Sequence, residues 1–237
     1  LMLRERGIPI HIGHSAANVT DDIAFVIRTA AVHDDNPEVH EAHRRGIPVF
    51  ERTQAWGALM RGYQNALCIS GTHGKTTTTS MCTHIMMAAE KDPTVMIGGT
   101  LPLLKACHRV GKGNTIIMES CEYYNSFLAL NPTIAVVLNI EADHLDFFKD
   151  LEDIKHSFRC FAERVPAETG TVIANYDDVN TMDALHGIAR KVITFGLNAK
   201  ADVYAQNIVH RGSVSEFDIY HRGNLFSHVT IHVPGIH

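Results

Sequence analysis

Residues 71–77, Gly71-Thr72-His73-Gly74-Lys75-Thr76-Thr77, decide the fold that this chain is expected to adopt. They lie between the apolar run Ala66-Leu67-Cys68-Ile69 and a segment that we expect to be a helix from residue 75 to about residue 90. A glycine-bearing loop that opens onto a helix directs successive backbone N–H groups toward one point, where the helix dipole also favours an anion. Lysine adds a positive charge, and a threonine hydroxyl is suited to ligating magnesium. The stretch therefore predicts a phosphate-binding loop in an α/β fold.

The loop is shorter than the common P-loop, and a plainer interpretation exists. Two residues separate Gly71 from Gly74-Lys75, whereas the common pattern has four. The plainer interpretation is a strand-to-helix turn followed by a solvated lysine. Local stability does not favour it, because a lysine in the first turn opposes the helix dipole and four consecutive threonines, residues 76–79, are poor helix formers. We therefore predict that residues 71–77 bind the phosphates of a nucleotide.

Composition limits the classes of partner. The chain has 237 residues, of which 45% are hydrophobic and 20% charged, as is ordinary for a globular protein. A formal net charge of -5 gives no general attraction to nucleic acid or to an anionic membrane, so we expect neither partner. The five cysteines are an odd number without a CxxC pair, and no apolar run approaches the roughly 18 residues of a membrane span. We expect a cytoplasmic protein.

Alternating apolar and helical patterns predict two α/β parts. In residues 1–62, strands are expected at residues 8–12, 23–27 and 47–50, and helices at residues 37–45 and 53–60. This alternation is typical of parallel strands with crossover connections, hence of part of a Rossmann-like domain. The polar residues 61–65 are the expected boundary, and residues 63–237 form the second part.

The second part has clearer strands. They are expected at residues 66–70, 115–118, 134–138, 172–174 and 192–195, with helices near residues 151–164 and 179–190. Such short, continuous apolar runs suit strands that are buried on both faces. From residue 202 to residue 233, extended segments interrupted by glycine turns predict antiparallel hairpins. The expected fold is a P-loop-type, mostly parallel sheet flanked by helices, with a small antiparallel sheet.

Polar side chains follow four of these strands. The phosphate-binding loop follows the first, Glu119 the second, Asn139, Glu141, Asp143 and His144 the third, and Asn175, Asp177 and Asp178 the fourth. Ligands of doubly wound sheets bind beyond the carboxyl ends of the strands. The sequence therefore predicts that these groups converge on one site.

Two of these side chains are candidate metal ligands, each with an alternative. Glu119 ends a strand where P-loop proteins often place an acid that holds magnesium; the alternative is a helix N-cap or a surface glutamate. His144 alone would be an ordinary histidine at the start of a helix, because magnesium prefers oxygen ligands. Asp143-His144-Leu145-Asp146 would also suit a Ser-His-Asp triad, but the chain has no G-x-S-x-G elbow. Cys121 would be an activated thiol or, more commonly, a buried structural cysteine.

Three ordered motifs resemble those of the Mur ligases. They are the loop with its threonines at residues 71–79, Glu119-Ser120-Cys121-Glu122-Tyr123 followed by Ser126-Phe127-Leu128, and Asn139-Ile140-Glu141-Ala142-Asp143-His144-Leu145-Asp146. The resemblance extends from Ile12-Gly13-His14 to Val233-Pro234-Gly235-Ile236-His237. Within the family, His73 resembles the alanine-adding branch or the related murein-peptide ligase. Phe158 stands where other branches carry a carbamylated lysine, and Cys121 where the family more often has aspartate.

The resemblance implies an ATP-dependent ligase of peptidoglycan precursor synthesis. It would join L-alanine to the carboxylate of UDP-N-acetylmuramate through an acyl phosphate. Lys75, Glu119 and His144 would be catalytic, and Thr76, Glu119 and His144 would hold magnesium. The alternatives are a murein-peptide ligase that recycles a tripeptide onto the same sugar nucleotide, a non-catalytic nucleotide-binding paralogue, and a kinase or GTPase. Retention of the catalytic side chains argues against the paralogue, and the short loop argues against the last class.

The resemblance also implies a domain assignment. Residues 1–62 would be the C-terminal part of the UDP-sugar-binding domain, and residues 63–237 the central ATP-binding domain. The family's C-terminal ligase domain would be absent, and its adenine-contacting segment would start at His237. We therefore expect the 237 residues alone to bind nucleotide weakly and not to catalyse ligation.

Overall fold

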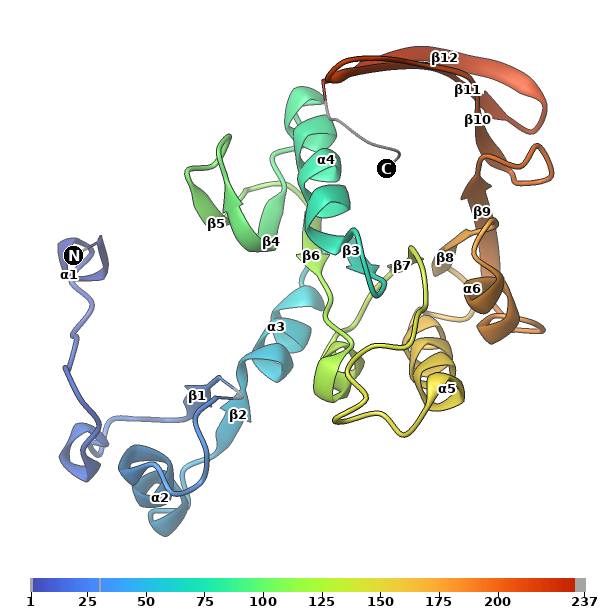
Figure 1. Cartoon of the computed structure of the whole chain (residues 1–237). Coiled ribbons are helices and arrows are strands. Elements are labelled where there is room, and N and C mark those ends of the chain that lie inside the picture. The colour runs from blue at the N-terminus through green and yellow to red at the C-terminus, as the bar shows by residue number, and fades with distance from the viewer. Residues whose placement is uncertain (1, 30, 233–237) are drawn as a thin grey trace. The chain divides into compact units, whose positions relative to one another are not determined.

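The computed structural model describes residues 2–29 and 31–232 (Figure 1). The chain divides into two compact units between Ala58 and Leu59. The boundary expected from the polar residues 61–65 lies slightly further along the chain. Among the described residues, no helix has the length and apolar character needed to cross a membrane.

The first unit contains a short parallel strand pair. Its elements are α1 (Met2–Glu5), η1 (Ala16–Asn18), β1 (Val26–Arg28), α2 (Pro37–Arg44), β2 (Val49–Glu51) and α3 (Arg52–Met60), which ends in the second unit. Parallel pairing of β1 with β2 confirms the predicted strand arrangement there. Helix α2 begins where expected, because the Asn36 side chain accepts the Glu38 N–H and Pro37 occupies the first turn.

The prediction of a strand at residues 8–12 is wrong. These residues adopt no helix or strand, and Ile12 is 89% exposed. A strand needs a hydrogen-bonded neighbour, and within the described residues β1 pairs only with β2. An apolar run is therefore not sufficient evidence for a strand where no partner covers it.

The second unit is built on one ten-stranded sheet in the part that the structure describes. Its strands are β3 (Asn65–Ser70), β4 (Thr94–Leu101), β5 (Ala106–Arg109), β6 (Thr115–Glu119), β7 (Ile134–Val137), β8 (Thr171–Asn175), β9 (Lys191–Gly196), β10 (Val203–Arg211), β11 (Val214–His221) and β12 (Asn224–Ile231). Their order is β12-β11-β10-β9-β8-β7-β3-β6-β4-β5. Seven neighbouring strands run parallel, from β10 to β4, which confirms the predicted fold class.

The predicted antiparallel hairpins are β10, β11 and β12. They do not form a separate sheet, because β10 pairs with β9 through Val203–Phe195 and Tyr204–Gly196. Figure 1 shows these strands curving away from the end of β9. The hairpins were expected to extend to Val233, which, like His237, lies outside the described residues. Strands β4 and β5 were not predicted, since the paired glycines Gly98 and Gly99 interrupt the apolar pattern of β4.

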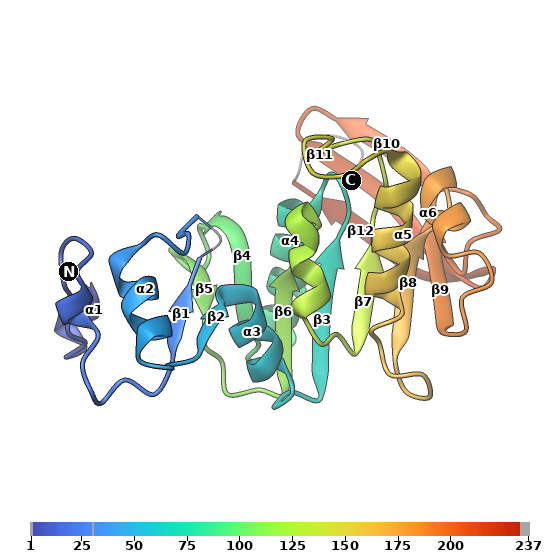
Figure 2. The ribbon, with the colours of Figure 1, turned by 90° about the horizontal axis from the view of Figure 1, so that it is seen from below.

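Helices pack along the parallel strands. Helix α4 (Lys75–Ala88) contacts β3, β4 and β6, whereas α5 (Leu151–Ala162) contacts β7 and α6 (Val179–Ala184) contacts β8 (Figure 2). The 3-10 helix η2 (Tyr123–Ala129) follows β6. Helix α6 is shorter than predicted: it ends before Gly187, whose φ of 67° does not continue a right-handed helix.

A buried apolar cluster fixes the strands that carry the candidate site. It consists of Leu67 and Ile69 of β3, Val95 of β4, Ile117 of β6, Val136 of β7 and the adjoining Leu138. Burial on both faces of β3 stabilises its position between β6 and β7, as the continuous apolar runs predicted. The loops that follow these three strands therefore start from neighbouring points on one sheet edge.

Candidate functional site

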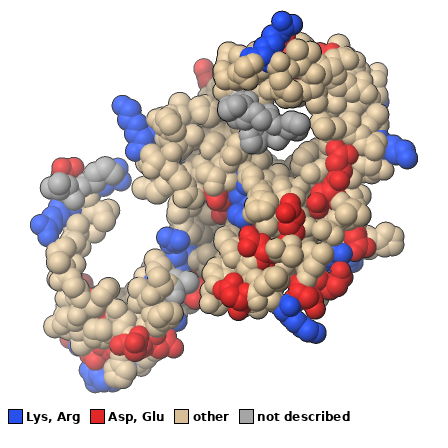
Figure 3. Space-filling model, in the orientation of Figure 1, with Lys and Arg blue, Asp and Glu red and all other residues tan. Residues whose placement is uncertain are grey.

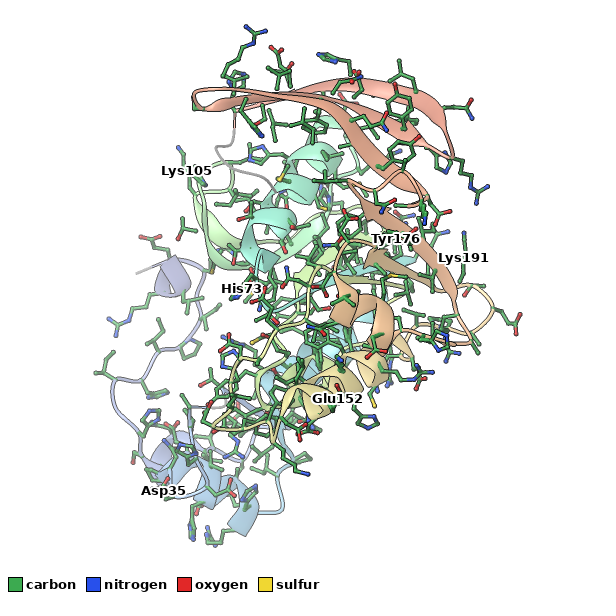
Figure 4. All side chains as sticks on the ribbon, turned by 45° about the vertical axis from the view of Figure 1, so that its right-hand side comes forward. Asp35, His73, Lys105, Glu152, Tyr176 and Lys191 are labelled. Atoms are coloured by element: carbon green, nitrogen blue, oxygen red, sulfur yellow. The ribbon has the colours of Figure 1, made fainter. Side chains whose placement is uncertain are left out.

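The loop between β3 and α4 has a backbone that depends on two glycines. Gly71 has a φ of 146°, and a Cβ there would lie 2.9 Å from the Leu138 Cβ. Gly74 precedes α4 with a φ of 83°, in the left-handed region. Figure 4 shows His73 at the N-terminal end of α4. The loop is therefore folded closely over the end of β7, as the sequence motif requires.

Four successive backbone donors of this loop are free to bind a ligand. In the described part of the chain, the N–H groups of residues 74–77 have no hydrogen-bond acceptor. Those of Thr72 and His73 instead donate to Asn139, to its backbone oxygen at 3.0 Å and to its Oδ1 at 2.7 Å. Unpaired N–H groups at a helix N-terminus form a site for an anion. This is the arrangement expected of a phosphate-binding loop.

The segment after β7 holds the loop in this shape. Asn139 Nδ2 donates to the His73 carbonyl at 3.1 Å, so its amide binds both backbone groups of His73. The Glu141 N–H donates to Thr72 Oγ1 at 2.9 Å, and Glu141 Oε2 lies 3.6 Å from His73 Nε2. Asn139 was expected only to converge on the site. Its specific role in shaping the loop follows from tertiary contacts.

Thr76 and Glu119 lie side by side. Thr76 Oγ1 donates to Glu119 Oε1 at 2.9 Å, and Glu119 Oε2 accepts the Gly98 N–H at 2.7 Å. A Cβ at Gly98 would lie 2.6 Å from Glu119 Oε1, so the carboxylate approaches the β4 backbone where a side chain is missing. Glu119 is thus neither a helix cap nor an isolated surface group.

Lys75 is held by the loop and by Glu122. Its Nζ donates to the carbonyls of Gly71 at 2.6 Å and Thr72 at 3.1 Å, and to Glu122 Oε2 at 3.0 Å. The Glu122 side chain is only 3% exposed. Glu122 belongs to one of the motifs quoted above but was not among the predicted site residues. A buried carboxylate must have a partner, yet the sequence does not reveal which glutamate of the motif will be buried.

His144 lies against the same glutamate. Its Nε2 is 3.8 Å from Glu122 Oε1 and 3.9 Å from Asp143 Oδ2, and its ring stacks on that of Tyr123. It occupies a turn with a φ of 52° and is not the first residue of a helix. Lys75 and His144 both approach Glu122, and Glu119 is hydrogen-bonded to Thr76, the residue after Lys75. The three predicted catalytic side chains therefore lie around the same loop.

The fourth strand supports the site without facing the loop. Asn175 Nδ2 donates to the Leu138 carbonyl at 2.9 Å, and Asp178 Oδ1 accepts the Ile140 N–H at 3.2 Å. Asp177 instead accepts the Leu197 N–H. The predicted convergence therefore holds for Asn175 and Asp178 as supports of the segment after β7, while Asp177 is directed to β9.

The structure supports neither of the two alternative chemistries, a Ser-His-Asp triad and an activated cysteine. Among the described residues no serine hydroxyl bonds to the His144 ring, so a Ser-His-Asp triad is not assembled. Desolvation raises the pKa of the Cys121 thiol above its usual value, although the residue as a whole is exposed. A raised pKa lowers the thiolate fraction, which argues against an activated thiol at Cys121. The Tyr123 hydroxyl donates to Asp146, which raises the pKa of Tyr123.

The donor set fits magnesium bound together with a nucleotide. Over the described residues, no cluster of three or more His, Cys, Asp or Glu side chains would hold a metal ion. Magnesium, however, keeps several waters and is commonly bound through one or two carboxylates plus phosphates. The adjacent Thr76 hydroxyl and Glu119 carboxylate supply such oxygens. Figure 3 shows acidic side chains gathered over α5, α6 and the segment before α5.

Comparison with known sequences agrees with this geometry. Residues 69–237 match the Mur ligase middle domain, and residues 2–64 match the domain described as Mur ligase family, catalytic domain. The UDP-N-acetylmuramate–L-alanine ligase of Caldicellulosiruptor bescii is 41% identical over 237 residues, covering 100% of this chain and 52% of the relative. That of Clostridium novyi is 43% identical over 235 residues, covering 99% and 51%. The chain spans about half the length of the curated relatives it matches.

Solved structures share the fold. The UDP-N-acetylmuramate-alanine ligase of Thermotoga maritima has a TM-score of 0.79 and 28% identity, covering 98% of this chain and 52% of that chain. A UDP-N-acetylmuramate:L-alanyl-gamma-D-glutamyl-meso-diaminopimelate ligase from Neisseria meningitides has a TM-score of 0.84 at 24% identity, covering 99% and 76%, which shows the fold alone. The predicted family is confirmed: the phosphate-binding loop, the acidic segment after β6 and the segment after β7 belong to a chain that is a member of the Mur ligase family.

Proposed function

We propose that this chain is the nucleotide-binding part of a cytoplasmic ligase that joins L-alanine to the carboxylate of UDP-N-acetylmuramate at the expense of ATP. The observation that carries the proposal is the row of unpaired N–H groups at residues 74–77 beside the Thr76–Glu119 pair. A helix N-terminus with hard oxygen ligands next to it suits a magnesium-bound triphosphate.

Each side chain has a role in this proposal. The N–H groups of residues 74–77 bind phosphate oxygens, and Lys75 exchanges Glu122 for the transferred phosphoryl group. Thr76 and Glu119 would hold magnesium, and His144 would hold a second ion. Magnesium, when bound, neutralises charge that develops on the phosphoryl oxygens. The carboxylate of the muramate takes the γ-phosphoryl group, the amine of alanine attacks the resulting acyl phosphate, and phosphate leaves. No protein nucleophile is needed.

Sequence identity supports alanine as the amine. The curated alanine ligases named above are 41% and 43% identical to this chain, and among the solved structures the Thermotoga alanine ligase is 28% identical, against 24% for the Neisseria ligase. The fold itself is similar in both, so it does not separate alanine from a tripeptide. A murein-peptide ligase is the second candidate, on the strength of that shared fold.

Two measurements test the proposal. In the 237-residue chain, binding of a non-hydrolysable ATP analogue is titrated with and without magnesium for the native sequence, Lys75→Ala and the control Lys191→Ala, an exposed lysine outside the site. We expect magnesium-dependent binding that Lys75→Ala abolishes and Lys191→Ala retains. In the full-length protein, phosphate release is then compared with L-alanine and with a tripeptide as the amine.

Phosphate release that depends on L-alanine supports the first function, and release that depends only on the tripeptide supports the second. Release with neither, despite nucleotide binding, favours a non-catalytic paralogue. Alanine-dependent release by the isolated 237 residues would contradict the expectation that this part alone does not ligate.

A further inference from the structure

The His144 ring is held by packing rather than by hydrogen bonds. Its Nε2 lies 3.8 Å from Glu122 Oε1 and 3.9 Å from Asp143 Oδ2, and both distances exceed that of a hydrogen bond. The side chain is 33% exposed. Its closest ring contact is Tyr123, with centroids 4.4 Å apart and planes inclined by 27°. Metal-binding histidines usually have a hydrogen bond that fixes the ring, so stacking replaces that support here.

Tyr123 is in turn anchored to the turn that carries His144. Its hydroxyl donates to Asp146, two residues after His144. The N–H groups of Phe147 and Phe148 both donate to the His144 carbonyl at 2.9 Å, and Phe148 is 2% exposed. Phe147 also meets the Tyr123 ring edge-on at 6.2 Å. The tyrosine therefore connects η2 to the turn after β7, and the histidine ring lies between these elements.

His144 has a backbone conformation that needs such support. Its φ of 52° is in the left-handed region, which is unfavourable for a non-glycine residue and persists only where neighbours enforce it. The Asp143 carboxylate accepts the His144 N–H at 2.7 Å, which fixes the backbone but not the ring. Ring orientation is left to the contact with Tyr123.

We propose that Tyr123 and Asp146 are positioning residues that hold the His144 imidazole in the orientation required to bind a divalent cation. The inference rests on the proposed function, since it assumes that His144 is a metal ligand. Tyr123 limits rotation of the ring by stacking, and Asp146 limits movement of Tyr123 through its hydroxyl. Pre-orientation of the ligand lowers the entropy lost when the ion binds.

The test uses Mn²⁺ in place of Mg²⁺, because bound and free Mn²⁺ are distinguished by electron paramagnetic resonance. The 237-residue chain is titrated with Mn²⁺ in the presence of a non-hydrolysable ATP analogue. The variants are Tyr123→Leu, which removes the ring, Tyr123→Phe, which keeps the ring and removes the hydroxyl, and Asp146→Ala. The matched control is Tyr63→Phe, which removes a hydroxyl that donates to Thr94 Oγ1 at 2.9 Å elsewhere in the same unit.

The relevant Mn²⁺ site is the one whose binding requires His144. We expect Tyr123→Leu to lower the Mn²⁺ affinity of this site by roughly 10-fold, and Tyr123→Phe and Asp146→Ala to lower it by about 3-fold each. The double variant Tyr123→Phe/Asp146→Ala should lose no more Mn²⁺ affinity than either single variant, because both substitutions remove the same hydrogen bond. In the full-length protein the same variants should lower kcat more than they raise the KM for ATP. Asp146→Asn keeps an acceptor for the hydroxyl and should restore most of the affinity.

Two results are decisive in different ways. In the first result, His144→Ala lowers the Mn²⁺ affinity but the Tyr123 variants bind Mn²⁺ as tightly as Tyr63→Phe does. This result would overturn the positioning role and leave the metal role of His144 intact. An unchanged affinity in His144→Ala itself would contradict the metal role assigned under the proposed function. Unfolding measurements on each variant separate loss of fold from loss of the site.

Discussion

Glu122 Oε2 lies 3.0 Å from Lys75 Nζ, and the side chains of this pair are 3% and 15% exposed. The two residues come from different motifs, the phosphate-binding loop and the segment after β6. The lysine of the loop is thus directed toward a buried carboxylate and two loop carbonyls. A bound phosphate must compete with these acceptors for Lys75.

The first prediction concerns the stability of this pair. Lys75→Ala leaves a buried carboxylate without its cation, and Glu122→Ala leaves a buried ammonium with carbonyl partners only, so each should lower the free energy of unfolding by roughly 3 kcal/mol. The double variant Lys75→Ala/Glu122→Ala removes both charges and should cost less than the sum of the two single variants. Urea denaturation of the four proteins measures these values.

The matched control for this prediction is Glu216→Gln, whose pair with Arg211 is exposed and 3.9 Å long. It should change the free energy of unfolding by less than about 1 kcal/mol. Strictly additive effects of the two site substitutions would show that Lys75 and Glu122 do not depend on each other.

The second prediction concerns the space that Gly98 leaves for Glu119. A Cβ in Gly98→Ala would lie 2.6 Å from Glu119 Oε1, and the flexible carboxylate would move away from Thr76. We expect magnesium-dependent binding of an ATP analogue to weaken by roughly 10-fold, with little change in stability, because only the end of a side chain must shift. Calorimetric titration measures the affinity.

The control for this prediction is Gly99→Ala, in which the new Cβ would meet Thr76 Cγ2 at 3.7 Å, an ordinary contact. Equal affinities in the two variants would refute the argument.

The third prediction concerns the two hydrogen bonds between the Asn139 side chain and the backbone of His73. Asn139→Ala removes both side-chain hydrogen bonds to His73, so the loop must become ordered when the nucleotide binds. We expect a roughly 10-fold loss of nucleotide affinity and about 1–2 kcal/mol of stability. Asn65→Ala, at the opposite end of β3, also removes a side-chain hydrogen bond and should leave the affinity unchanged. A nucleotide affinity of Asn139→Ala equal to that of the native chain would contradict this role of Asn139.

The fourth prediction concerns pH and the first unit. Hydrogen bonds from Arg44 and Arg45 lower the pKa of Glu41 from 4.5 to about 2. Because the pKa is lower in the folded state than in the unfolded chain, the stabilisation is fully present above pH 4.5 and is lost as the pH falls toward about 2. Fluorescence of Trp56, the single tryptophan, which lies in α3 of the same unit, monitors unfolding of this unit.

In this experiment, Glu41→Gln should be less stable than the native chain at neutral pH, and the difference should disappear near the folded-state pKa. Asp35→Asn, at an exposed carboxylate without an ion pair in the described residues, is the control and should follow the native profile. A stability difference for Glu41→Gln that is independent of pH would contradict the assigned cause.

Much of the second unit was predictable because its signals are local. Continuous apolar runs predicted β3, β6, β7, β8 and β9, since strands buried on both faces leave no polar alternation. Glycine turns predicted the hairpins of β10 to β12. The predictions failed where the signal was not local: residues 8–12 have no partner strand within the described part, and β4 contains two glycines, one of which makes room for Glu119.

The sequence by itself determined which chemical groups this protein carries: a glycine-bearing loop with Lys75 and Thr76, an acid at the end of a strand, and a histidine after the next strand. These follow from residue type and chain position. Only the tertiary structure decided that Glu122 would be the buried partner of Lys75 and that Asn139 would shape the loop. The physical reason is that burial and hydrogen bonding depend on which segments the sheet order brings together, and β3 lies between β6 and β7 although β6 and β7 come later in the chain.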